Sequence, residues 1–291
     1  MRKTIAEIHE LKRQGKKISM LTAYDYTSAK MLESAGIPLI LVGDSLGQVI
    51  LGYDSTIPVT MEQMIHHTQA VVRGTSRSMV VSDMPFLSYH TDNGQAIENA
   101  GRLLQEGGAQ AVKLEGGGSK IASIVSKLTE CGIPVMGHIG LLPQSINLVS
   151  GSKVRGKTAH EAASLVTDAL DLEASGAFAL VLELIPHPLA RLITESVRIP
   201  TIGIGSGTGC GGQIQVLNDF LGFNLDFIPK HAKPYLNLNE LIKDAIQRYI
   251  VDVESGDFPT TDQTLSMNES LLDGIIRKRI SHSVVRGVDG A

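Results

Sequence analysis

The stretch AVKLEGGGS, residues 111–119, joins a short β-rich run to a lysine, a glutamate and three glycines. Side chains alternate along a strand, so Lys113 and Glu115 face one side and the apolar residues beside them face the other. The glycines at 116–118 let the backbone bend sharply and approach a ligand closely. A single pair of this kind could be an ordinary ion pair at a strand end. Similar polar strand ends recur along the chain, however, and this favours a shared site.

Apolar strand-like runs alternate with helical patterns over most of the chain. The runs lie at 18–22, 39–42, 79–81, 110–114, 134–137, 178–182, 201–204 and near 225–228. Helical periodicity lies at about 25–35, 61–73, 94–106, 119–131, 159–174, 187–196, 213–220 and 239–254. Eight βα units predict an α/β fold, a single (β/α)₈ TIM barrel. An open doubly wound sheet is the alternative, but it does not normally have eight strands that all lead to one site.

Further segments flank the predicted barrel. Apolar residues at helical spacing behind Thr4 predict an N-terminal capping helix that ends at Gly15. We expect residues 1–256 to form the catalytic barrel domain and residues 257–291 to form a C-terminal extension. The extension contains one more amphipathic pattern, around 266–279, and a polar end that we expect to be mobile.

Composition limits the possible partners and location. The chain has 291 residues, a formal net charge of -4 and no tryptophan, which argues against nucleic acid as a partner. Cys131 and Cys210 lie far apart and form no CxxC, as expected for reduced thiols of a cytoplasmic protein. The first residues lack the apolar block of a signal peptide, and no apolar run approaches the ~20 residues that span a bilayer. We therefore expect a cytoplasmic protein without a membrane partner.

Polar residues follow the predicted strands at their carboxyl ends. In a barrel these ends meet on one face, where the active sites of this architecture lie. The residues are Asp44 and Ser45, Asp83, Lys113 and Glu115, His138 and Glu183. Taken singly, an aspartate is often a turn or cap residue and a histidine is often part of a wall. Together, four carboxylates would repel one another strongly unless a cation or Lys113 lay among them.

The kinds of ligand atom favour a hard cation. Asp44, Asp83 and Glu115 offer oxygen atoms, with no cysteine near them in the pattern, so Mg²⁺ is favoured over zinc. A 2-oxo acid can chelate Mg²⁺ through its carboxylate and keto oxygens, which makes the neighbouring C–H acidic by stabilising the enolate. Lys113 can neutralise the substrate carboxylate.

A base for this chemistry is present on the sixth strand. Glu183 lies in the apolar phrase LVLELIP, where a carboxylate needs a partner or a role, so we expect it to remove the α-proton. Its pKa is expected to be raised by these surroundings. His138 could orient groups or shuttle protons, as an auxiliary residue.

The sequence resembles the ketopantoate hydroxymethyltransferase family over approximately residues 1–256. The phrases that carry the resemblance are LTAYDYTSA (21–29), LVGDSLGQVILGYDSTIPVT (41–60), VVSDMPF (80–86), AVKLEGG (111–117), PVMGHIGLLPQS (134–145) and IGIGSG (202–207), in order. The resemblance implies transfer of a hydroxymethyl group from 5,10-methylenetetrahydrofolate to 3-methyl-2-oxobutanoate, giving 2-dehydropantoate for pantothenate synthesis. It also implies Mg²⁺, a cytoplasmic location and a homo-oligomer, a decamer.

The resemblance also assigns roles, which fall on the residues chosen above. The metal carboxylates correspond to Asp44, Asp83 and Glu115, and the proton acceptor to Glu183. The substrate contacts correspond to Asp44, Ser45, Asp83 and Lys113. The sequence departs from the usual family pattern at Leu142, Ser206, Gly211 and Asn218, where the family usually has threonine, alanine, an acidic residue and histidine. None of these four positions corresponds to a metal ligand or to the base, but their loops flank the mouth of the barrel. The resemblance therefore defines the reaction more closely than it defines folate binding or subunit contacts.

Two other functions fit parts of the pattern. A lyase of the phosphoenolpyruvate mutase and isocitrate lyase type would share the barrel, but such lyases usually carry a reactive cysteine in a KKCGH-like phrase, which is absent. A catalytically silent barrel that binds an anion or scaffolds an assembly is a third possibility.

Two local patterns are weaker signals. The GTGCGG phrase at 207–212 with Asp226 fits a dinucleotide fingerprint, but it comes too late in the chain for a first βα turn. The basic loop with Lys153, Arg155 and Lys157 could meet a folate polyglutamate tail, although such loops are commonly just solvated.

Overall fold

The computed structural model describes residues 1–148, 154–224 and 228–275. Eight parallel strands close into a barrel in chain order, so the predicted TIM barrel is confirmed. The strands are β1 Ile18–Thr22, β2 Leu39–Val42, β3 Met79–Asp83, β4 Ala111–Glu115, β5 Val135–Gly140, β6 Ala179–Glu183, β7 Thr201–Ile204 and β8 Gly212–Gln215.

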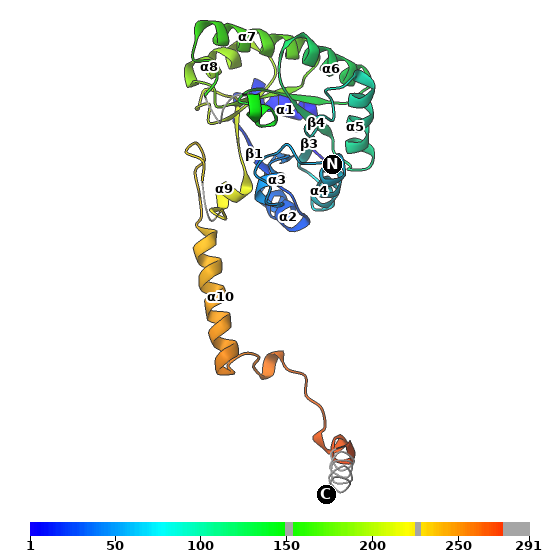
Figure 1. Ribbon diagram of the computed structural model, residues 1–291, viewed down its shortest axis with the longest axis vertical. Coiled ribbons are helices and arrows are strands. Elements are labelled where there is room, and N and C mark those ends of the chain that lie inside the picture. The colour runs from blue at the N-terminus through cyan, green and yellow to red at the C-terminus, as the bar shows by residue number, and fades with distance from the viewer. Residues whose placement is uncertain (149–153, 225–227, 276–291) are drawn as a thin grey trace, which may run out of the picture. The chain divides into compact units, whose positions relative to one another are not determined.

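Helices connect most strands and surround the barrel (Figure 1). Those of the barrel unit are α1 Ile5–Arg13, α2 Tyr26–Ser34, α3 Leu46–Val49, α4 Met61–Arg73, α5 Asn93–Gln105, α6 Gly118–Glu130, α7 Ala159–Ala174, α8 His187–Ser196 and α9 Leu217–Leu221, with a 3₁₀ helix at Pro143–Leu148. Local side chains fix several starts: Thr60 and Thr158, for example, accept hydrogen bonds from the first turns of α4 and α7. Short glycine turns follow α2 and α6, where Gly36 and Gly132 have φ of +83° and +81°.

The eighth strand lies at a different place from the one that the sequence predicts. Three residues of the expected run 225–228 lie outside the described residues, and β8 falls partly inside the range 213–220 that was expected to be helical. β8 pairs with β1 on one side and β7 on the other, and the Gly212 backbone lies so close to Ile18 that no side chain would fit. Pairing on both edges closes the barrel, and this tertiary gain outweighs the local helical pattern.

Two apolar layers are separated by the strands. Leu39 and Leu41 belong to the cluster inside the barrel, whereas Ile40 and Val42 pack with the surrounding helices. This alternation continues in β4, where Ala111 faces the interior and Val112 and Leu114 pack toward the helices. The predicted orientation of β4 is therefore confirmed, and its polar side chains lie inside the barrel at its carboxyl end.

Helix α1 covers the amino end of the barrel, as predicted. Ile8 is fully buried in the interior cluster, and His9 Nε2 lies 2.8 Å from the carbonyl oxygen of Phe178, just before β6. Lys12 Nζ donates to the carbonyl oxygens of Val197 and Ile199 at 2.7 Å. The interior of the barrel is thus closed at its amino end.

The chain divides into two compact units, Met1–Leu238 and Asn239–Ala291. The second unit contains nearly all of α10 (Leu238–Ser255) and 3₁₀ turns at Thr261–Gln263 and Glu269–Leu271. Of the helix expected at 266–279, residues 276–279 lie outside the described residues, as does the polar end of the chain. The domain boundary at residue 256 stays a prediction. No helix in the described ranges has the length and apolar character needed to cross a membrane.

Candidate active site

The structure brings the predicted residues together at the carboxyl ends of β2 to β6. Lys113 Nζ lies 3.1 Å from Asp83 Oδ1 and 3.9 Å from Glu115 Oε1. His138 then joins the last two carboxylates, with Nδ1 3.6 Å from Glu115 Oε1 and Nε2 3.3 Å from Glu183 Oε2. These contacts form a continuous polar chain across the top of the barrel.

The residues of this polar network are buried, so the charge of each one depends on the charges of its neighbours. Asp83, Lys113 and Glu115 are at most 4% exposed. Burial alone lowers the pKa of the Lys113 ammonium, but the surrounding carboxylates outweigh it and raise that pKa above its usual value. Glu115 responds in the opposite direction: burial raises its pKa, but its hydrogen bond to His138 and the nearby positive charges lower it overall. Lys113 and Glu115 are therefore both charged in the folded protein.

Asp44 and Asp83 are the two acids of the cluster whose charged forms are disfavoured. Burial, followed by repulsion from Asp83 and Glu115, raises the pKa of Asp44 well above its usual range. Burial also raises the pKa of Asp83, although Lys113 opposes the shift. These two carboxyl groups would release their protons more readily if a further cation came to the site.

The surroundings of His138 favour its positively charged form. Burial and the charge of Lys113 lower its pKa, but hydrogen bonds to Glu115 and Glu183 outweigh them and raise it to about 9. Nζ of Lys113 lies 3.3 Å from Nδ1 of His138, which is why this neighbour opposes protonation. The imidazolium can then donate one N–H to each carboxylate.

Gln144 and Tyr89 belong to the site but were missed by the sequence reasoning. Gln144 Nε2 donates to Asp44 Oδ2 at 2.8 Å, and its backbone N–H donates to Glu115 Oε2 at 3.1 Å. The Tyr89 hydroxyl bonds Gln144 Oε1 at 2.8 Å. The signal in the sequence is the phrase PVMGHIGLLPQS, which contains Gln144 but gives no reason to place its amide among carboxylates.

Each of the three candidate metal carboxylates has one oxygen bonded by an amide. Asp83 Oδ2 accepts the backbone N–H of Asp44 at 3.0 Å, and Gln144 bonds one oxygen of Asp44 and one of Glu115. The other oxygen of Asp83 is buried without a well-aligned hydrogen bond in the described part of the chain. That oxygen has the Lys113 ammonium at 3.1 Å as its charged neighbour. Carboxylate oxygens from three acids that lie side by side are the donor chemistry that a hard cation needs.

The acids do not form a complete ligand set by themselves. Within residues 1–148, 154–224 and 228–275, no three His, Cys, Asp or Glu side chains converge as a ready-made metal site. Mg²⁺ commonly uses only one or two carboxylates and keeps water or substrate oxygens in its other positions. The residues present therefore fit a partly open Mg²⁺ site.

Ser45 lies at the edge of the same group and is partly exposed. Its Oγ is 2.8 Å from the hydroxyl of Tyr24, and a Cβ on Gly43 would come within 2.8 Å of it. Gly43 thus leaves room for Ser45 and for Asp83, whose Oδ2 is 3.5 Å from the same position. The serine hydroxyl can face a bound substrate while Tyr24 holds it.

The backbone around Glu183 is strained and tightly held. Its side chain is 14% exposed, and the next residue, Leu184, has a φ of +47° in the left-handed region. The buried Ser206 hydroxyl donates to the Leu182 carbonyl at 2.8 Å and accepts from the Ile185 N–H at 3.1 Å. Ser206 therefore ties down the turn that carries Glu183.

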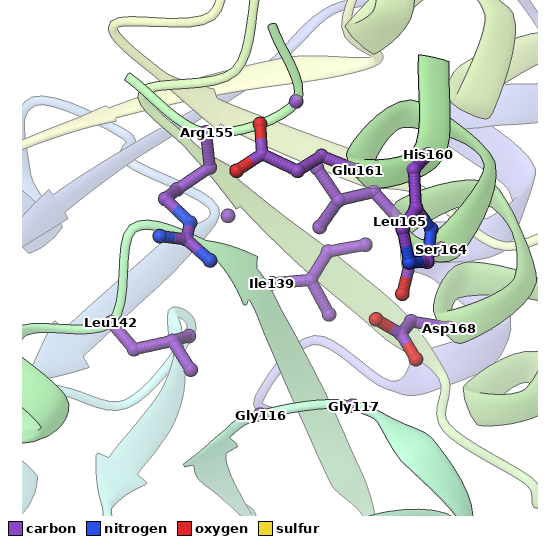
Figure 2. A pocket seen from close by; sticks show the side chains of 12 residues that line it. Gly116, Gly117, Ile139, Leu142, Arg155, His160, Glu161, Ser164, Leu165 and Asp168 are labelled. Carbon is purple, nitrogen blue, oxygen red and sulfur yellow. The ribbon is translucent and has the colours of Figure 1, made fainter. Parts of the chain in front are cut away.

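A cavity of about 270 Å³ lies beside this site, between β5 and α7. Figure 2 shows Ile139 of β5 and Asp168 of α7 pointing toward the space that they share with Arg155. Arg155 comes from the predicted basic loop, of which Lys153 lies outside the described residues. Gly140, at the end of β5, lines the cavity and pairs with Glu183 of β6. The cavity and the acidic cluster are therefore separate spaces that share one strand end.

Solved structures with the same fold include 2,3-dimethylmalate lyase, described as a member of the PEP mutase/isocitrate lyase superfamily. Its TM-score is 0.53 with 14% identity, and the match covers 99% of each chain. This likeness shows the fold alone.

Sequence comparison is more specific. The family model for ketopantoate hydroxymethyltransferase matches residues 2–261. The 3-methyl-2-oxobutanoate hydroxymethyltransferase of Dehalococcoides mccartyi is 56% identical over 273 residues, covering 94% of this chain and 96% of that protein. The enzyme of the same description from Chloroflexus aurantiacus is 55% identical over 272 residues, with the same coverage. The chain therefore belongs to the ketopantoate hydroxymethyltransferase family.

Proposed function

We propose that this enzyme transfers a hydroxymethyl group from 5,10-methylenetetrahydrofolate to 3-methyl-2-oxobutanoate, giving 2-dehydropantoate for pantothenate and coenzyme A synthesis. Membership of the family supports the reaction class. The single structural observation that carries the proposal is the buried chain of contacts from Asp83 through Lys113, Glu115 and His138 to Glu183. A carboxylate base then lies beside a cluster suited to a cation and an oxo acid.

Asp44, Asp83 and Glu115 would hold a Mg²⁺ ion as the cofactor. Such an ion, when bound, would polarise the keto group of the substrate and make the neighbouring C–H more acidic. The pKa values of Asp44 and Asp83 are raised because burial disfavours their charged forms, and a bound cation would stabilise those charges. Binding of the ion is then expected to release protons.

Lys113 binds the substrate carboxylate. Its ammonium lies at the centre of the cluster, 3.1 Å from Asp83, and is buried, so its charge is weakly screened. Ser45, Asp44 and Asp83 complete the substrate contacts on the β2 and β3 side. The substrate is thereby oriented with its C–H toward β6.

Glu183 removes the α-proton. Its Oε2 lies 3.3 Å from His138 Nε2, an ion-pair contact that favours one direction of the carboxylate and leaves Oε1 for the proton. The electron pair released at the α-carbon then forms the bond to the one-carbon unit of the folate. Both C–N bonds of that unit break, water supplies the hydroxyl oxygen, and the proton taken by Glu183 and one proton of the water end on the two folate nitrogens, which leaves tetrahydrofolate. His138 acts as an auxiliary group that holds Glu183 and shares its charge.

We also propose that the enzyme is a cytoplasmic homo-oligomer, a decamer. Helix α10 has no buried residue, and an apolar stripe at helical spacing is about half exposed: Ile246, Tyr249, Ile250 and Val253. A stripe of this kind is commonly covered by another subunit. The number ten comes from the resemblance alone, and light scattering of the full chain tests it.

Deuterium exchange into 3-methyl-2-oxobutanoate, without folate, tests the proposed function. Followed by ¹H NMR in D₂O, exchange should require both enzyme and Mg²⁺. Glu183→Gln should suppress exchange and still bind Mg²⁺ and the oxo acid, whereas Glu195→Gln on the exposed surface of α8 should behave as wild type. A catalytically silent barrel predicts no exchange in any variant, and exchange at the wild-type rate in Glu183→Gln would remove Glu183 from the role of base.

A further inference from the structure

Gln144 forms hydrogen bonds to the acidic cluster, but the proposed function gives it no role. It is 3% exposed and lies just after β5, in the 3₁₀ helix Pro143–Leu148. Its Nε2 donates to Asp44 Oδ2 at 2.8 Å and to the Met84 carbonyl oxygen at 2.9 Å, while its backbone N–H donates to Glu115 Oε2 at 3.1 Å. One residue therefore bonds two acids that follow different strands, β2 and β4.

The orientation of the amide follows from its partners. The Met84 carbonyl can only accept, so the atom that faces both Met84 and Asp44 must be the NH₂ group. The opposite atom, Oε1, accepts the Tyr89 hydroxyl proton at 2.8 Å. Tyr89 is fully buried, and its oxygen in turn accepts the Glu115 N–H at 3.1 Å. Each hydrogen-bonding group of the amide has a partner, and a flipped amide would place oxygen against oxygen.

These bonds fix which carboxylate oxygens face away from Gln144. Gln144 occupies Oδ2 of Asp44 and Oε2 of Glu115, so a cation would meet Oδ1 of Asp44 and Oε1 of Glu115. The second of these oxygens also has Lys113 and His138 as neighbours. Without the two donors, Asp44 Oδ2 and Glu115 Oε2 would each lose this hydrogen bond, and the two carboxyl groups could rotate. Groups that orient metal-binding carboxylates in this way commonly change metal affinity when they are removed.

We propose that Gln144, oriented by Tyr89, is a positioning residue that fixes the carboxylates of Asp44 and Glu115 for a divalent cation. The proposal rests on the Mg²⁺ site of the proposed function and adds to it two residues that touch no reacting atom. A positioning role differs from a purely structural one in its effect: loss of the Gln144 amide should lower the affinity for Mg²⁺ in a protein that still folds.

Calorimetric titration of the full chain with Mg²⁺ alone tests the proposal. Gln144→Met keeps the shape of the side chain and removes its amide, so the bond to Asp44 is lost while the backbone N–H to Glu115 remains. It should weaken Mg²⁺ binding by about 10- to 100-fold. Tyr89→Phe removes only the hydroxyl and should weaken binding toward the lower end of that range. The control is Gln110→Met, because Gln110 also makes two amide hydrogen bonds, to Val80 and Gly108, but at the amino end of β4.

Activity measurements give a second readout. In both site variants, the Mg²⁺ concentration for half-maximal deuterium exchange should rise by a similar factor, while the rate at saturating Mg²⁺ changes less. Unchanged Mg²⁺ affinity in either folded variant would overturn the positioning role. Wild-type protein that binds no Mg²⁺ would instead refute the metal in the proposed function, so the two failures are distinguishable. If Gln144→Met does not fold, Tyr89→Phe alone decides the result.

Discussion

His138 Nε2 lies 3.3 Å from Glu183 Oε2, and the same ring reaches Glu115 Oε1 through Nδ1 at 3.6 Å. One imidazole thus connects the proposed base on β6 with a proposed metal carboxylate on β4. The ring is 2% exposed, so both contacts are shielded from water. Substitution of His138 should therefore change the reactivity of Glu183, while Glu183 itself stays in place as a base.

His138→Gln should slow deuterium exchange by up to about 100-fold, the usual effect of misplacing a catalytic group by about 1 Å. Glutamine can still donate from its one nitrogen, but it has no second donor atom to face the other carboxylate and it cannot carry a charge. The measurement is the exchange rate at saturating Mg²⁺ and substrate. His9→Gln is the matched control, because His9 bonds the Phe178 carbonyl at the amino end of the barrel. Equal rates in wild type and His138→Gln would exclude an auxiliary role for His138.

Gly140 sets the distance between β5 and the strand that carries Glu183. It has a φ of +106°, and a Cβ there would collide with the Glu183 carbonyl oxygen. Gly140→Ala should cost about 1–3 kcal/mol in backbone strain and should also reduce exchange, since the collision moves the base. Gly132→Ala is the control: its φ is +81°, but nothing lies within 4 Å of a Cβ. Loss of stability with normal exchange in Gly140→Ala would contradict this link.

Much of the barrel was predictable because its strands are buried on both faces. Runs such as Leu39–Val42 are continuously apolar, and glycine turns such as Gly36 mark their starts, so seven of the eight strands fell close to their observed positions. β8 was missed because its sequence GQIQ contains only one apolar residue, and its position is decided by pairing with β1 and β7. Local pattern cannot report such tertiary pairing.

The candidate site shows the same division. Asp44, Asp83 and Glu115 could be placed together because the carboxyl ends of barrel strands converge. Gln144 and Tyr89 could not, because they lie in connecting segments whose path through space has no periodic signature. Hydrogen bonds between such segments and the strand ends become visible only in three dimensions.

Glu33 should make stability depend on pH in the acid range. Its side chain is 11% exposed and accepts hydrogen bonds from the backbone and hydroxyls of Ser76 and Ser78. Burial raises its pKa, but these bonds outweigh burial and lower it to about 2 from 4.5. The stabilisation is therefore complete above about pH 4.5 and is lost as the pH falls toward 2.

Glu33→Gln should lower the free energy of unfolding at pH 7 by roughly 1.5–3 kcal/mol, the usual contribution of hydrogen bonds to a charged group. Urea unfolding at several pH values measures this difference. It should shrink as the pH falls from about 4.5 toward 2, because the carboxylate then binds a proton in the unfolded state while it is still charged in the folded state. Glu195→Gln on the exposed face of α8 serves as the control. A difference that stays constant from pH 7 to about pH 2 would show that the charge of Glu33 contributes nothing.

Arg155 should act on the folate rather than on the oxo acid. Its side chain lines the cavity between β5 and α7 (Figure 2), beside the strand end that Gly140 shares with Glu183. Arg155→Gln should raise the KM for polyglutamylated 5,10-methylenetetrahydrofolate by about tenfold or more, since a lost hydrogen bond to a charged group costs about 1.5–3 kcal/mol. Deuterium exchange, which needs no folate, should stay at the wild-type rate.

Arg198→Gln, at an exposed position before β7, is the control for the loss of one positive charge. If both variants raise the folate KM equally, the effect comes from the general charge of the protein, because the two arginines differ in position and not in charge. An unchanged folate KM in Arg155→Gln would exclude this cavity as the place where the acidic tail of the donor binds, since Arg155 supplies the permanently charged cation among its lining residues.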